Sequence, residues 1–102
     1  MKKLGLLFLL MAPAVLADAT PDGAAIFKSN CAMCHGADGK GQTPAGKSLK
    51  IRDLGSPDVQ KQSDAELAKI VADGKGTMPA YKAKLGADAI QAVVAHIRTL
   101  KR

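Results

Sequence analysis

The chain has 102 residues, of which 15 are basic and 9 are acidic, giving a formal net charge of +6. This length allows one domain rather than two. The lysines are spread along the chain and aromatic residues make up only 3% of it, which argues against the clustered basic and aromatic surface of a nucleic-acid-binding protein.

The beginning of the chain has the pattern of an export signal. Two lysines are followed by the apolar run 4–11, and the small residues near Ala17 suit a signal peptidase. We therefore expect residues 1–17 to be a signal peptide, with cleavage after Ala19 as the alternative, and residues 18–102 to form the mature domain. A retained membrane anchor is the other interpretation, but the apolar run is well short of the roughly 20 residues that span a bilayer.

Removal of the signal peptide would also change the net charge of the protein, and export would set its location. Removal of the signal would take Lys2 and Lys3 with it and leave a net charge of +4. Such a mildly basic surface suits acidic partner surfaces. The mature protein would then be periplasmic.

The residues after the signal begin with a helical pattern. Residues 22–30 are predicted to form a helix, capped by Asp22 or Thr20. Gly23 and Phe27 lie four residues apart on one face of it. Because glycine costs about 1 kcal/mol in a helix, Gly23 indicates either the close approach of another helix or simple tolerance near a helix start. Phe27 is expected in the core.

The middle of the chain is rich in glycine. Residues 36–46 contain four glycines and are predicted to form a loop. Their spacing matches neither the P-loop nor the dinucleotide fingerprint, and the glycines would let the backbone pass close to a large planar ligand. Residues 47–62 are ambiguous, although we expect Leu49, Ile51 and Leu54 to be buried.

The second half of the chain contains two further helices. Residues 56–57 (Ser-Pro) open a short helical turn, residues 63–66 form a capping box, and Gly74 ends the helix that the box begins. A last helix starts at Gly86 or Asp88. Its apolar stripe consists of Ile90, Val93, Val94, Ile97 and Leu100. Since no stretch alternates as a strand, we predict an all-α fold with three or more helices.

Residues 31–35 read Cys-Ala-Met-Cys-His, the C-x-x-C-H motif of c-type haem attachment. One helical turn can present two thiols at this spacing to the two vinyl groups of a porphyrin, and each thiol then forms a thioether. We predict Cys31 and Cys34 as the covalent haem attachment and His35 as the proximal iron ligand. The other ring nitrogen of His35 is expected to donate to a backbone carbonyl.

Two other interpretations of this motif remain open. The residues could be two ordinary cysteines and a surface histidine, or a haem-free thiol oxidoreductase site, although the latter usually follows a strand in a βαβ unit.

A bound haem would also help to fill the core of this small domain. Phe27 and Tyr81 are the only aromatic residues of the expected mature chain, and a flat apolar macrocycle would fill a core that they cannot.

A second axial ligand can come from few side chains. Met33 lies inside the attachment motif and cannot reach the far face of the haem. His96 falls on the apolar face of the last helix, where a histidine is more often packed than ligating. Met78, in a turn stiffened by Pro79, remains as the predicted ligand, because a thioether is a soft ligand and His/Met ligation raises the reduction potential. An ordinary buried methionine is the alternative.

On these residues the chain resembles the class I c-type cytochromes, the small monohaem kind found in bacteria. The resemblance covers nearly all of residues 22–100. It rests on the glycine, phenylalanine and cysteine spaced by four along residues 23–31, on the attachment motif, on Met78-Pro79 and on the closing amphipathic helix. It implies a cytochrome c fold wrapped around one covalently attached haem c.

The resemblance also implies particular contacts. The first and last helices are expected to cross at Gly23, with His96 in a position where tyrosine is usual in the family. The carbonyl of Pro44 is the best match to the one that accepts a hydrogen bond from the proximal histidine, His35, although this loop lacks the usual Gly-Pro pair.

The expected function is electron transfer by a protein that is not an enzyme, with redox proteins as partners and no nucleic acid. The alternative is a haem-based sensor or peroxidase-like protein with an open sixth coordination site. Lysines could ring the exposed haem edge or could simply be solvated charges. The lysines considered for such a ring are Lys40, Lys47, Lys82 and Lys84.

Overall fold

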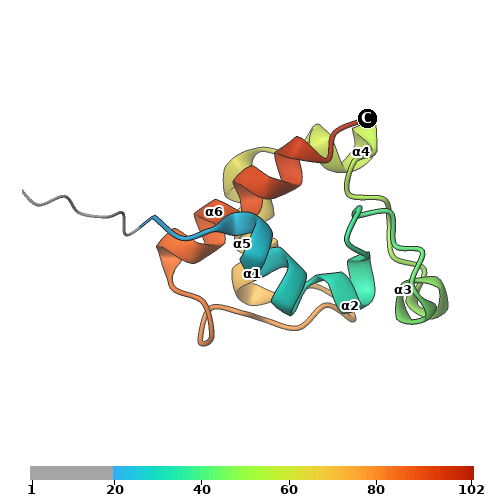
Figure 1. Cartoon of the computed structure of the whole chain (residues 1–102), viewed down its shortest axis with the longest axis horizontal. Helices are drawn as coiled ribbons and strands as arrows, with labels where there is room; N and C mark the ends of the chain where they lie inside the picture. The colour runs from blue at the N-terminus through green and yellow to red at the C-terminus, as the bar shows by residue number, and fades with distance from the viewer. Residues whose placement is uncertain (1–19) are drawn as a thin grey trace, which may run out of the picture.

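The structure is a computed structural model that describes residues 20–102. The expected signal peptide, residues 1–17, lies outside the described residues. Over the described range the chain forms six helices and no strand (Figure 1). The helices are α1 (Gly23–Asn30), α2 (Ala32–His35), α3 (Pro44–Leu49), α4 (Pro57–Gln60), α5 (Asp64–Asp73) and α6 (Ala87–Thr99). The predicted all-α class is confirmed.

Capping residues explain where two of these helices begin. The Asp22 carboxylate accepts a hydrogen bond from the backbone N–H of Ala25 at 3.1 Å, so Asp22 rather than Thr20 caps α1. At α5 both hydrogen bonds of the predicted capping box form. The Ser63 hydroxyl accepts from the N–H of Glu66 at 3.0 Å, and the Glu66 carboxylate accepts from the N–H of Ser63 at 2.8 Å.

One element differs from the prediction. Residues 44–46 were expected to belong to a loop, but Pro44 opens α3. Thr43 supplies the cap, since its hydroxyl accepts from the N–H of Gly46 at 2.9 Å. Proline at the first helical position loses no intrahelical bond, so the pair Thr43-Pro44 starts a helix rather than breaking one.

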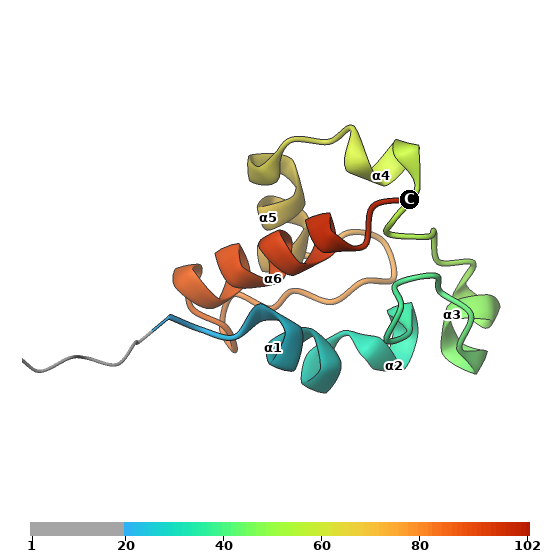
Figure 2. The same ribbon diagram turned by 45° about the horizontal axis from the view of Figure 1, so that its top comes forward.

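The core lies between α1, α5 and α6, and Figure 2 shows α5 and α1 on either side of α6. Phe27 and Val93 are at its centre, with 2% and 0% of their surface exposed. The buried stripe of α6 is formed by Ile90, Val93, Val94 and Ile97, as predicted. Leu100 caps the helix and is only half-buried.

Helix α1 packs across α6 at Gly23. A side chain on Gly23 would collide with the carbonyl of Ala92 and lie 3.4 Å from the Cβ of His96. The close approach of a second helix is therefore the reason for this glycine. The absence of a Cβ lets two backbones come together where a larger residue would separate them.

Substitution of Gly23 by alanine tests this crossing. Alanine improves helix propensity, but its methyl group has to displace the backbone of α6, and overpacking of this kind costs about 1–3 kcal/mol. We expect Gly23→Ala to lower the free energy of unfolding by about 1–2 kcal/mol in denaturant titrations of the haem-bound protein. Gly86→Ala is the control, because nothing lies within 4 Å of its position, and it should cost under about 1 kcal/mol. Equal effects of the two changes would contradict the crossing.

Arg98 of α6 holds the segment between α4 and α5. Its guanidinium donates to the Asp64 carboxylate at 2.8 Å, to the Gln60 carbonyl at 3.0 Å and to the Gln62 carbonyl at 2.6 Å. These bonds fix a turn of irregular backbone against a regular helix. The turn forms one wall of the cavity described below.

None of the helices within residues 20–102 is both long enough and apolar enough to cross a lipid bilayer.

Candidate haem site

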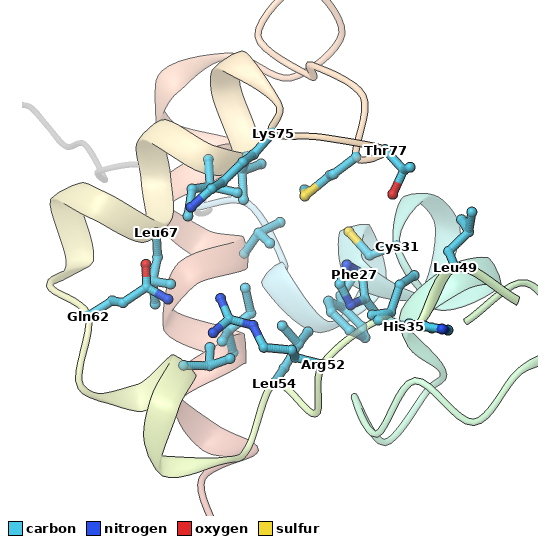
Figure 3. A pocket seen from close by; sticks show the side chains of 18 residues that line it. Phe27, Cys31, His35, Leu49, Arg52, Leu54, Gln62, Leu67, Lys75 and Thr77 are labelled. Carbon is cyan, nitrogen blue, oxygen red and sulfur yellow. The ribbon is translucent and has the colours of Figure 1, made fainter. Parts of the chain in front are cut away.

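A cavity of about 240 Å³ lies between the attachment motif, α5, α6 and the segment 49–54 (Figure 3). Figure 3 shows Cys31 and His35 on one side of it and Leu67 and Gln62 on the other. Its lining is mainly aliphatic. The apolar residues that contribute are Phe27, Leu49, Ile51, Leu54, Val59, Leu67, Ile70, Val71, Met78, Val93 and Ile97.

The attachment motif sits at a break between two helices. Cys31 ends α1 and also precedes the single turn of α2, so the chain changes direction at the first thiol. Cys31 and His35 line the large cavity, and all three motif side chains line a smaller adjoining one of about 50 Å³. Met33 points away, with 81% of its surface exposed. It is thus unsuited to be an iron ligand, as expected.

The environment of His35 suits a metal ligand. Burial lowers the pKa of this imidazole, so it is neutral at physiological pH and has a lone pair to offer. Its Nδ1 is buried without a hydrogen-bond partner among the described residues. The expected bond to the carbonyl of Pro44 is therefore absent, and that expectation was wrong. Pro44 instead begins α3.

The thiols do not have the properties of a redox pair. Burial, with a contribution from the neighbouring Cys34, raises the pKa of Cys31 to about 11. A nucleophilic cysteine needs the opposite shift, since the thiolate is the reactive form. The raised pKa of Cys31 weighs against the haem-free thiol oxidoreductase.

Met78 reaches the same cavities from a tight turn. The N–H of Lys75 donates to the carbonyl of Met78 at 3.0 Å, and the N–H of Met78 donates to the carbonyl of Lys75 at 2.9 Å. Gly74 precedes this turn at a φ of 78°, and a side chain there would collide with the Met78 carbonyl. The turn brings Met78 into both cavities that Cys31 and His35 line.

His96 lies at the helix crossing rather than in the cavity. Its ring packs on Phe27 with the ring centroids 4.9 Å apart. It is absent from the lining of both cavities. The side chain occupies the position on α6 that the family resemblance implied, beside Gly23.

The sequence did not indicate the polar side of the cavity. Lys50, Arg52, Gln62 and Lys75 all line it, and within residues 20–102 none of the three basic side chains forms an ion pair. Lys50, Arg52 and Gln62 lie within residues 47–62, where the sequence showed neither a helical nor a strand pattern. The two basic residues close together at positions 50 and 52 were the one feature of the sequence that could have indicated this polar side.

The predicted burial of Leu49, Ile51 and Leu54 needs correction. Leu49 was expected to be buried, but 43% of its surface is exposed, because it sits at the mouth of the cavity. Ile51 and Leu54 are half-buried rather than buried. The lysines considered for a ring around the haem edge, Lys40, Lys47, Lys82 and Lys84, are exposed, and none of them lines either of the two cavities described above.

Together these residues fit a c-type haem. Two thiols, a neutral imidazole and a thioether face an apolar cavity, and they are the groups that attach and ligate such a cofactor. The unpaired basic side chains suit the two propionates that a haem carries.

Comparison with known proteins agrees with the site. Residues 18–97 match the family described as cytochrome C oxidase, cbb3-type, subunit III. Cytochrome c6 of Nostoc sp. is 40% identical over 90 residues, covering 88% of this chain and 78% of that protein. Cytochrome c6 of Microcystis aeruginosa is 41% identical over 76 residues, covering 74% of this chain and 90% of the relative. The solved structure of the KustC0563 c-type cytochrome superposes with a TM-score of 0.74 at 30% identity, covering 79% of this chain and 99% of that one.

The chain therefore belongs to the c-type cytochromes, as a small class I member. It carries covalently bound haem c, and it is an electron-transfer protein that acts with redox partners rather than an enzyme.

Proposed function

We propose that the protein carries one electron at a time on an iron held between His35 and Met78, with Cys31 and Cys34 as the thioether attachments. The observation that carries this proposal is that Cys31, His35 and Met78 all line both cavities, and that Cys34 lines the smaller one with them. A bound haem c supplies the redox chemistry, as its iron alternates between the ferric and ferrous states.

The residues around the iron set how easily it is reduced. The thioether of Met78 and the apolar lining both disfavour the extra positive charge of the ferric state and so raise the potential. Lys50, Arg52 and Lys75 act in the same direction through their charge, and their positions suit pairing with propionates. If His35 and Met78 held the iron in both oxidation states, little change in geometry would be needed for each electron transfer.

Partner recognition is proposed to be electrostatic. The net charge of +4 expected after signal removal favours an acidic docking surface on the partner. Leu49 and Met33 are the large hydrophobic side chains most exposed among the described residues, and they lie at or next to the site. An apolar contact of this kind on a protein of net positive charge would let a partner approach closely and still release quickly. The expected signal at residues 1–17 supports a periplasmic location.

Visible absorption of the purified, exported protein tests the proposal. We expect a ferric band near the red end of the spectrum, from methionine–iron charge transfer, and a ferrous spectrum that added carbon monoxide leaves unchanged. Both follow from a sixth position that Met78 fills. Rapid carbon monoxide binding by the native protein would favour the alternative, a sensor or peroxidase-like protein with an open site.

A further inference from the structure

A hydroxyl group joins the loop that carries Met78 to the segment that carries the haem attachment. The Tyr81 Oη donates a hydrogen bond to the backbone carbonyl of Asn30 at 3.1 Å. Tyr81 follows Met78 by three residues, and Asn30 immediately precedes Cys31. The bond thus links two segments that lie 51 positions apart in sequence.

The carbonyl that accepts this bond belongs to the last turn of α1. Carbonyl groups at a helix end have no intrahelical partner and need one from elsewhere. Tyr81 supplies it, and Asn30, Tyr81 and Met78 all line the smaller cavity. Burial raises the pKa of the Tyr81 phenol, so the group keeps its proton at neutral pH and remains a donor.

The loop has a second, separate anchor on α5. The backbone N–H of Tyr81 bonds to the carbonyls of Val71 and Ala72 at 3.0 and 3.2 Å, and the N–H of Lys82 bonds to Ala72 at 3.1 Å. The aromatic ring also packs with Met78 against the buried cluster of Val71, Leu85 and Ile90. None of these contacts needs the hydroxyl.

The hydrogen bond from the Tyr81 hydroxyl is therefore independent of the contacts that hold the loop on α5. Among residues 20–102, no other hydrogen bond or ion pair joins the segment 75–85 to α1 or α2. A change of Tyr81 to phenylalanine removes this link alone and leaves the backbone bonds and most of the packing in place.

We propose that the Tyr81 hydroxyl is a positioning group that holds the Met78 loop against the attachment segment and so keeps Met78 on the iron. This inference rests on the proposed ligation by Met78. Movement of the loop away from α2 would carry the sulfur off the iron, and the hydroxyl bond opposes that movement. A net hydrogen bond of ordinary strength changes such an equilibrium about 2- to 10-fold.

Imidazole binding to the ferric holoprotein measures how often the sixth position opens. We expect Tyr81→Phe to attach haem normally, to keep the methionine–iron charge-transfer band in buffer, and to bind imidazole about five-fold more tightly than the unmodified protein. The expected rise comes from a larger open population, so the rate of imidazole association should rise by a similar factor.

Thr43→Val is the matched control. Thr43 also donates a hydroxyl hydrogen bond to a carbonyl of the attachment segment, that of Cys34 at 2.9 Å, but it comes from the α3 side, and among the described residues no hydrogen bond joins it to the Met78 loop. This variant should lose stability without a comparable change in imidazole binding. Unchanged binding in Tyr81→Phe, or an equal increase in both variants, would overturn the inference.

Met78→Ala in the same assay separates the two proposals. If it binds imidazole far more tightly than the unmodified protein while Tyr81→Phe does not, the ligation stands and only the role of Tyr81 is lost. If Met78→Ala binds imidazole like the unmodified protein, Met78 is not the ligand, and both proposals are overturned.

Discussion

Replacement of Met78 by alanine should lower the reduction potential by several tenths of a volt while leaving the haem covalently attached. The physical reason is the loss of a soft sulfur ligand that favours ferrous iron, together with the entry of water or another hard ligand. Axial ligands and their surroundings control a range of roughly 0.8 V. A potentiometric titration monitored by visible absorption measures the shift, and the charge-transfer band should disappear with it.

Met33→Ala provides the matched control for this experiment. The two methionines are the same residue type and both lie close to the site, but Met33 has 81% of its surface exposed and lines neither cavity. Its replacement should leave both potential and spectrum unchanged. A potential that stays constant in Met78→Ala would exclude Met78 as the ligand.

Without haem the chain should be largely unfolded. The described residues bury only nine large apolar side chains, and just one of these, Phe27, is aromatic. Many of the same side chains also form the wall of the cavity, so a chain without the cofactor would expose them. In proteins of this kind the free energy of cofactor binding is a large part of the free energy of folding.

The variant Cys31→Ser/Cys34→Ser, prepared without haem, tests this expectation. Its far-ultraviolet circular dichroism should show less than about half of the helical signal of the holoprotein, and its thermal transition should be broad or missing. The haem-bound unmodified protein is the reference for both measurements. Native-like helicity with a cooperative transition would mean that the polypeptide core suffices by itself.

Local patterns made much of the fold predictable. The capping box at residues 63–66 and the apolar stripe of α6 depend on neighbours within a turn or two, and both form as predicted. For Gly23 the residue pattern left either a helix crossing or tolerance near a helix start, and the family resemblance implied the crossing; its partner Ala92 is visible only in the structure. The predictions for the attachment motif and for Met78 also rest on short local motifs, and the structure brings Cys31, His35 and Met78 to the same cavities.

The parts that could not be predicted depend on distant segments. The polar wall formed by Lys50, Arg52, Gln62 and Lys75 is brought together from segments with no common period. The exposure of Leu49 depends on its place at the cavity mouth, and hydrophobicity alone predicted burial. The carbonyl of Pro44 was expected to accept a hydrogen bond from His35, but Pro44 instead begins α3.

Phe27 touches rings on two sides, and this has a consequence for engineering the protein. Its centroid lies 4.9 Å from that of His96 and 6.4 Å from that of His35. One aromatic residue therefore lies between the interhelical seam and the proposed iron ligand. We expect variants selected for thermal resistance at this seam to shift the reduction potential as well, so that the two traits evolve together rather than independently.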